Sequence, residues 1–425
     1  MTSLNAEKYL RGLPLKNDRE MSERYAALSA EMTGMAETSR RVFHICCDGL
    51  FSAHTAAMLA AALCSAGVSS ASVAFDALCE DDMRHTIVFV DGKRVPEQVF
   101  SPAVRELRAA MRAHGNISGR YEAGAALAVL SCRNSGARVL ISDVSGLPCE
   151  VLSLLPPPSC VVLGPVDDTI RPALRRMISK STFETVSTPQ SPEIQRMLTD
   201  TCAAAGCRLT VAAKHGMPGG PEVGTLTFGG VAFSYRGVDA RISSVFVSAV
   251  LCACAATDTV RAMRRSGFAI SDSDIAAGVR VSSPLCHGTV VSINPAVIVA
   301  SVPDDGGHAE RSTALAAVVA DIASAKQLTG KSVTLFFPGS GAPADEIVSA
   351  FGGCGVEVSA VILAAEGESP AAAARRAASE IVITDAEIDA QGDTDEVRSY
   401  IIIGTRRENE EALPLLREGI RRTMI

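Results

Sequence analysis

Short apolar runs alternate along the chain with longer Ala-rich segments, and this alternation predicts the fold. The apolar runs are bounded by Gly, Pro, Asp or Ser, as is typical of buried strands, and the Ala-rich segments are long enough for helices. Strands separated by helical crossovers predict a mostly parallel sheet flanked by helices. In the first half of the chain we expect strands at 42–45, 70–75, 86–90, 138–142 and 160–164, helices at 56–66 and 121–132, and a hairpin turn at Asp91-Gly92.

The middle of the chain has a different pattern. Residues 209–237 are rich in Gly and alternate Val, Thr and Phe, which predicts an antiparallel hairpin or ribbon, and 241–257 predicts a tightly packed helix. After Pro284 a second α/β series begins, so we expect two domains, 1–284 and 285–425. In the second domain we expect strands at 296–300, 332–337, 357–363 and 400–404 and helices at 309–325 and 344–351.

Composition narrows the class of protein. The 425 residues are 47% hydrophobic, enough to bury sizeable cores, and carry a net charge of −7. This acidic balance and an aromatic content of 4% argue against nucleic-acid binding, which needs a basic face and stacking rings. The longest uncharged stretch, 55–75, is broken by Gly67 and reads as helix, turn and strand, so we expect no membrane span.

The cysteines and the N-terminal residues indicate the cellular compartment of the protein. The 13 cysteines include no C-x-x-C pair, and most lie in Ala- and Val-rich runs where a thiol packs as a small apolar group. The first twenty residues carry charges of both signs and no apolar core of a signal peptide. We therefore expect a cytoplasmic protein.

The turn between the first strand and the first helix is the first candidate site. A nucleotide-binding domain of this class places a Gly-rich loop with a lysine there, whose N–H groups and charge hold the phosphates. Residues 46–55 contain one glycine, Gly49, and no lysine. Asp48 would repel phosphate, and Phe51 is bulky where the backbone should approach the ligand closely. The expected position is present without the expected chemistry.

Carboxylates after two buried strands form a second candidate site. Asp143 follows one strand, and Asp167 and Asp168 follow the next. The carboxyl ends of parallel strands share one edge of a sheet, where ligands bind, so Asp143 and Asp168 could share a magnesium ion. The alternative, that these are solvated loop acids, stays open. The histidines are scattered and show no zinc-binding spacing.

Several short segments also follow one another in a specific order. They are 6–10, 43–45 with the helix 56–67, 90–93, 121–124, 188–193 and 233–237. From about residue 6 to the C-terminus, this order resembles the folylpolyglutamate synthase/dihydrofolate synthase family of the Mur-ligase superfamily. The resemblance implies an N-terminal P-loop-like Mur-ligase central domain and a smaller C-terminal Rossmann-like domain. It also implies an enzyme in which ATP phosphorylates a carboxylate and glutamate attacks the acyl phosphate, with magnesium as the metal.

Little of that chemistry carries over to these residues. The family's G-T-N-G-K-G-S/T loop falls on 47–55, where its lysine becomes Phe51 or Ser52. Only Gly49, Ser52 and Thr55 could still contact a phosphate, as a vestigial site. The family's magnesium-binding glutamate corresponds to Asp143, and its D-H pair to Asp167-Asp168. Lys180 is the nearest lysine to the family's carbamylated one, and it is the one candidate catalytic residue.

Other family motifs depart as well. Ser243 replaces the Asn of the nucleotide contact, His287 the linker arginine, and Ala300 and Pro303 the Asp and His of the D-x-A-H-N loop. Losing one donor from a preorganised site typically lowers the rate by about 10²–10³. The apolar scaffold is kept.

Two hypotheses follow. The leading one is a folylpolyglutamate synthase-like protein that is catalytically reduced or inactive and acts as a binding or partner subunit, for a folate-like or other small acid or for a true ligase. The alternative is an active ATP-dependent carboxylate–amine ligase acting on a folate-like acid, with Asp143, Asp168 and Lys180 around magnesium. Magnesium and ATP are implied by the resemblance alone.

Overall fold

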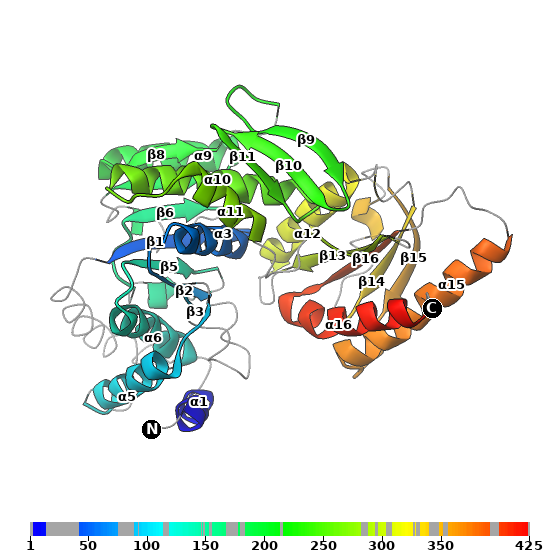
Figure 1. The fold of residues 1–425 in the computed structure, drawn as a ribbon, viewed down its shortest axis with the longest axis horizontal. Coiled ribbons are helices and arrows are strands. Elements are labelled where there is room, and N and C mark those ends of the chain that lie inside the picture. The colour runs from blue at the N-terminus through cyan, green and yellow to red at the C-terminus, as the bar shows by residue number, and fades with distance from the viewer. Residues whose placement is uncertain are drawn as a thin grey trace. The chain divides into compact units, whose positions relative to one another are not determined.

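The computed structural model describes the chain in segments. These are residues 3–13, 42–74, 89–91, 93–113, 119–145, 147, 149–152, 155–166, 177–178, 183–212, 216–281, 288–293, 296–302, 308–325, 328, 332–339, 348–351, 356–391 and 399–423. They group into two compact units (Figure 1). The first comprises 1–222, 234–240 and 251–282, and the second comprises 223–233, 241–250 and 283–425. The boundary expected at 284/285 stays a prediction.

The described part of the first unit is built on an eight-stranded sheet, which confirms the expected mostly parallel α/β architecture. From β2 to β8 every pairing is parallel, and the β2–β3 and β3–β4 pairings at one edge are antiparallel. The antiparallel edge is the hairpin expected at Asp91, whose φ of 51° is the left-handed conformation such a turn requires. The strand order is β4 (Lys93–Arg94), β3 (Phe89–Val90), β2 (Ser70–Ala74), β5 (Val139–Asp143), β1 (Phe43–Asp48), β6 (Cys160–Leu163), β7 (Glu184–Ser187) and β8 (Arg208–Val211).

Helices cover both faces of this sheet. On one face α6 (Arg120–Ser135), α5 (Glu97–Ala113) and α1 (Ser3–Arg11) form successive layers whose apolar side chains share one core cluster. The helix α3 (Ser52–Ser65) also packs on β1, β2 and β5. It contributes no side chain to that core cluster and therefore covers the opposite face of the sheet. The other helices described in this unit are α7 (Cys149–Leu152), α9 (Pro192–Ala205), α11 (Asp272–Val281) and most of α10 (Val247–Arg265).

The Ala-rich composition of α3 has a packing reason. A Cβ placed on Gly278 of α11 would lie 2.5 Å from the backbone nitrogen of Ala62, so the two helices touch almost backbone to backbone. Small residues on both helices permit this approach, and larger ones would force them apart. None of the helices in the described segments combines the length and the hydropathy that a membrane span requires.

The middle of the chain differs in part from expectation. A three-stranded sheet joins β9 (Glu222–Thr227), β10 (Gly230–Tyr235) and β11 (Val238–Ile242), and the two-residue turns between these neighbours make it antiparallel, as expected. The first residues of the expected ribbon instead form β8, which pairs parallel with β7. Alternation alone does not distinguish an edge strand of the main sheet from a ribbon.

The helix expected at 241–257 was placed too early. It is α10 (Val247–Arg265), because Arg241 and Ile242 complete β11. Its start is fixed by Asp321, whose carboxylate accepts from the backbone N–H and the hydroxyl of Ser248 at 2.9 and 2.5 Å. A cap supplied from more than seventy residues away leaves no local signal in the sequence.

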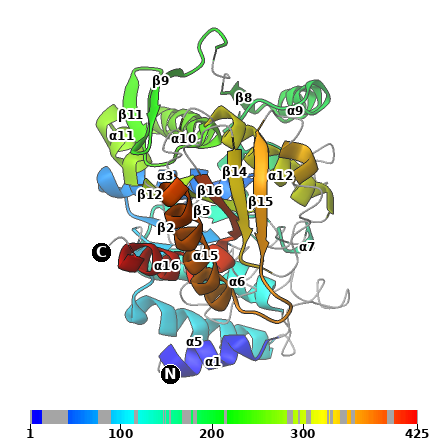
Figure 2. The same cartoon turned by 90° about the vertical axis from the view of Figure 1, so that its right-hand side faces the viewer.

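In the second unit, the described residues form a sheet ordered β12 (Thr289–Ile293), β13 (Ala296–Val302), β16 (Ser399–Thr405), β14 (Ser332–Phe337) and β15 (Glu357–Leu363). It is parallel except for β12. Alternate residues of β13, β14 and β16 join two separate core clusters, one with α12 (His308–Ser324) and one with α15 (Pro370–Gln391) and α16 (Arg406–Thr423). Figure 2 shows α15 and α16 side by side. The expected strands and the helix 309–325 are confirmed; most of the expected helix 344–351 lies outside the described residues.

Candidate functional site

The turn that leaves β1 is tightly packed against the segment that follows β6. Gly49 has a φ of +89°, and a Cβ there would lie 2.9 Å from Cγ1 of Val166 and 3.0 Å from the carbonyl oxygens of Gly164 and Pro165. Both the conformation and the space therefore require glycine at this position. Phe51 follows in the left-handed region, with a φ of 62°, at the start of α3.

Most backbone amides of this turn, residues 49–55, form hydrogen bonds within the protein. In a phosphate-binding loop such N–H groups point at the ligand and cradle its oxygens. Here five of them donate to protein oxygens, and one acceptor is the carboxylate of Asp48. The pairs are Gly49 N to Asp48 Oδ1 at 2.8 Å, Leu50 N to Pro165 O at 2.8 Å, Ser52 N to Gly49 O at 3.1 Å, His54 N to Phe51 O at 3.0 Å and Thr55 N to Phe51 O at 3.3 Å.

A buried carboxylate lies beside the turn. Asp143 ends β5 opposite Cys47 of β1, and it is 1% exposed. Its Oδ1 accepts from the hydroxyl of Ser52 at 2.6 Å and from the hydroxyl of Ser145 at 2.9 Å. Since Ser52 is one of the two positions where a phosphate loop of the resembling family carries lysine, the side chain there is tied to an acid rather than aimed at an anion.

Charge at this edge of the sheet is negative. Asp48 and Asp143 end adjacent strands and are both buried. Burial raises the pKa of the Cys46 and Cys47 thiols well above the usual range, and the two carboxylates raise it further. These thiols are therefore protonated and inert at neutral pH, because only the thiolate is a nucleophile or metal ligand.

The nearby histidine of β1 supplies no positive charge. His44 is fully buried, and its ring nitrogens bond to the carbonyl of Pro156 at 2.8 Å and the hydroxyl of Ser142 at 3.0 Å. Burial lowers the pKa of His44 to about 4, so the ring is neutral at pH 7. No cation from this strand balances the acids at the turn.

The structure brings together four of the residues expected at the site. Gly49, Ser52 and Thr55 lie on one strand–turn–helix junction, and Asp143 contacts it through Ser52. Asp168 and Lys180 lie outside the described residues. Within those segments, no group of three His, Cys, Asp or Glu side chains could hold a metal ion.

Two residues that contribute to this site were not predicted from the sequence. Ser145 is the second hydroxyl on Asp143. Gln190 donates to the carbonyl of Gly164 at 2.7 Å and accepts from the amide of Val166 at 3.1 Å, so it fixes the segment on which the turn packs. Ser145 stands two residues after a strand-ending acid, a spacing typical of a side-chain turn, and this signal could have found it.

The chain folds into two units, and each is a mostly parallel sheet with helical crossovers. A strand–turn–helix junction follows the first strand. These features are those of a two-domain α/β protein. Its fold is that of folylpolyglutamate synthases. A complex of FPGS with AMPPCP and folate matches with a TM-score of 0.70 at 13% identity, over 98% of this chain and 99% of that one. Folylpolyglutamate synthetase from Lactobacillus casei matches with a TM-score of 0.63 at 14% identity, over 100% of both chains. Folylpolyglutamate synthase from Mycobacterium tuberculosis, complexed with ADP and AMPPCP, matches with a TM-score of 0.63 at 14% identity, over 99% and 97%.

Comparison by sequence gives no match, either to a protein-family model or to a curated protein. At 13–14% identity the structural likeness is one of fold. What the chain does therefore depends on the side chains at its own sites.

Proposed function

We propose that this chain has the folylpolyglutamate synthase fold without the ATP-dependent ligase reaction, and that it acts as a binding or partner subunit. One observation carries the proposal: at the turn after β1, five of the seven amides of residues 49–55 donate to protein oxygens, and the buried acids Asp48 and Asp143 end the two strands beside it. A triphosphate brought to this turn would meet like charge and engaged donors. Burial makes such repulsion stronger than it would be in water.

The residues present do not fit magnesium–ATP at this turn. Ser52, which could have contacted a phosphate, donates its hydroxyl to Asp143, and Thr55 is 2% exposed. An arrangement that loses several electrostatic contacts keeps little rate enhancement, because each is worth about 10²–10³ in rate. We therefore derive no phosphoryl-transfer step for this chain.

The proposed ligand is supported by one structure of this fold, a complex of FPGS with AMPPCP and folate. We propose a folate-like or other small acid as the bound molecule and a true ligase as the protein partner. Co-purification of the native protein tests the partner: a second chain in stoichiometric amount is expected, and the native protein purified alone contradicts this half of the proposal.

A second function is favoured by one observation, the placement of Asp143 at the carboxyl end of β5 beside the turn. Ligands of open parallel sheets bind at this edge. An active carboxylate–amine ligase would use Asp143, with Asp168 and Lys180, around magnesium and ATP.

The deciding experiment incubates the purified chain with magnesium–ATP, glutamate and a reduced folate, and measures ADP. We expect no stoichiometric ADP, while a folylpolyglutamate synthase assayed in parallel releases it. An Asp143→Ala variant is the matched control, because ADP release by the chain itself would fall with this substitution and release by a contaminant would not. ADP formed by the wild type and lost in Asp143→Ala would establish the ligase instead.

A further inference from the structure

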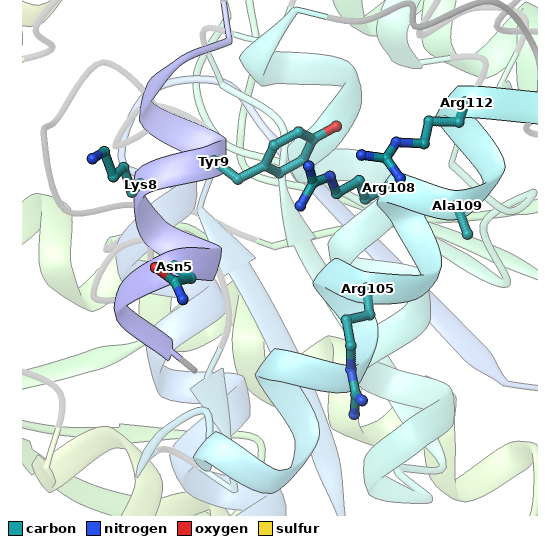
Figure 3. A pocket seen from close by; sticks show the side chains of 7 residues that line it. All are labelled: Asn5, Lys8, Tyr9, Arg105, Arg108, Ala109 and Arg112. Atoms are coloured by element: carbon teal, nitrogen blue, oxygen red, sulfur yellow. The ribbon is translucent and has the colours of Figure 1, made fainter. Parts of the chain in front are cut away.

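The outer face of α5 carries arginines at helical spacing and faces α1 across a cavity. Arg105, Arg108 and Arg112 lie at i, i+3 and i+7, so they share one side of the helix. Over seven residues the helix rises about 10 Å, which sets the length of this basic row. The cavity has a volume of about 760 Å³ and is lined by Asn5, Lys8, Tyr9, Arg105, Arg108, Ala109 and Arg112 (Figure 3). We name it the α1/α5 groove.

Among the side chains that the structure describes, the cations of the groove have no carboxylate partner. No ion pair between these side chains involves Lys8, Arg105 or Arg112, and Arg108 lies over the ring of Tyr9, 5.2 Å from its centroid. The one acid between these arginines, Glu106, forms its ion pair with Arg133 of α6. Four positive side chains thus gather in one cavity of a chain whose net charge is −7.

The walls of the groove are fixed by the core. Ala6 and Leu10 of α1 are fully buried in the cluster that also contains Leu107 and Met111 of α5. The hydroxyl of Tyr9 donates to Sδ of Met111 at 3.4 Å and ties the two helices together. Burial raises the pKa of this phenol, so Tyr9 adds no negative charge to the groove. Figure 3 shows Tyr9 reaching from α1 towards α5, with Arg108 and Arg112 close to its ring.

We propose that the α1/α5 groove binds a small molecule bearing a chain of two or three phosphates, through Arg105, Arg108, Arg112 and Lys8. Guanidinium groups bind phosphate oxygens through two parallel N–H bonds, which gives them a geometric match to phosphate that an ammonium lacks. A row about 10 Å long suits several linked anionic groups rather than one. The amide of Asn5 adds a neutral polar group at the rim.

The size and charge of the groove favour a small ligand. A cavity of about 760 Å³ lies within the range of small-molecule sites. A long nucleic acid needs a basic surface that follows many phosphates, and the row of arginines in the groove is short. The site differs from the turn after β1, where the proposed function excludes a triphosphate.

The test is calorimetric titration of the full chain with inorganic tripolyphosphate, in a phosphate-free buffer of low ionic strength without magnesium. We expect saturable binding that is much tighter than that of orthophosphate and that weakens as salt is added. The double variant Arg105→Gln/Arg112→Gln should weaken it by about tenfold, the combined loss expected for two charge-assisted contacts at an exposed site. Both arginines are exposed, so the fold should be kept, and an unchanged thermal midpoint checks this.

The matched control is Arg375→Gln/Arg417→Gln, which removes the same charge from exposed positions of α15 and α16 and should leave the affinity unchanged. The proposal is overturned if tripolyphosphate does not saturate the wild type, or if the groove and control variants behave alike. Equal affinity for a tri-glutamate peptide overturns the assignment to phosphate, and tighter binding of a single-stranded oligonucleotide overturns the small-ligand assignment. ATP binding whose affinity is the same in the wild type and in Arg105→Gln/Arg112→Gln would instead contradict the proposed function, so the two failures are distinguishable.

Discussion

Two regions of the first unit carry opposite chemistry, and both differ from what their positions suggest. The turn after β1 occupies the place where this class of fold holds phosphates, yet Asp48 and Asp143 make it acidic and five of its seven amides donate to protein oxygens. The α1/α5 groove lies on an outer helical layer, yet it gathers four cations that have no carboxylate partner among the described side chains. The position of a site in the fold therefore does not determine its charge. The charge depends on which side chains line the site and on whether other groups of the protein pair with them.

The largest effect is expected from Gly49→Val. The substitution combines a left-handed φ of +89° with contacts of 2.9–3.0 Å, and strain and overpacking each cost about 1–3 kcal/mol. We expect a loss of about 3 kcal/mol or more in the free energy of unfolding, measured in urea. Gly136→Val is the matched control, because Gly136 has a φ of +70° with no neighbour within 4 Å and should lose only the strain part. Equal losses would show that the turn has room, which would reopen it to a ligand.

The second effect is the dependence of the free energy of unfolding on pH, which His44 is expected to cause. The pKa of His44 is about 4 in the folded chain and about 6.5 when unfolded, so the unfolded state binds the proton first as pH falls. The contribution of neutral His44 is present above pH 6.5 and is lost progressively down to pH 4, by about 3 kcal/mol in all.

Unfolding in urea at several pH values measures this contribution, with His44→Gln for comparison. The wild type should lose stability between pH 6.5 and 4 more steeply than the variant does. Parallel curves would mean that His44 titrates near its usual pKa. A cation would then form beneath the turn under mildly acid conditions, and the contrast with the groove would shrink.

The third effect is expected from Asp143→Ala. The substitution leaves the buried hydroxyl of Ser52 without its acceptor at 2.6 Å, and an unsatisfied buried polar group costs about 1–3 kcal/mol. We expect a loss of about 2 kcal/mol in the free energy of unfolding. Asp272→Ala removes an acid that is 50% exposed and paired with Arg264 at 2.7 Å, and it should cost under about 1 kcal/mol. A stable Asp143→Ala protein would indicate that the acid serves a ligand rather than the fold.

The sequence predicted the scaffold better than the sites, for a physical reason. Apolar alternation is a local signal, so β13, β14 and β16 could be located from it, and their alternate residues do face two different cores. The start of α10 depends on Asp321, and the packing of the turn depends on Gln190; neither partner is adjacent in sequence.

The two sites illustrate the same limit. The acid at Asp48 was visible in the sequence, whereas its bond to the Gly49 amide required coordinates. The groove was missed entirely, although Arg105, Arg108 and Arg112 have helical spacing, because α5 and its neighbour α1 were not predicted as helices. A row of charged residues can be identified as a binding site only when the element that faces it is known, which here is α1.

The smallest expected effect tests most directly whether the arginines of the groove are paired with carboxylates. Arg105 lies three residues before Arg108, in the middle of the helix, and like charges on neighbouring positions of one helix face destabilise it by about 0.2–0.5 kcal/mol. In phosphate-free buffer at low salt, Arg105→Gln should therefore raise the free energy of unfolding in urea by a few tenths of a kcal/mol, and about 0.5 M salt should abolish the gain. Arg375→Gln, with only Ala and Ser at three and four residues to either side, should show no gain. If Arg105→Gln is instead destabilising at low salt, a carboxylate pairs with Arg105. The groove would then be internally neutralised, as the turn is, and would not be free to bind an anion.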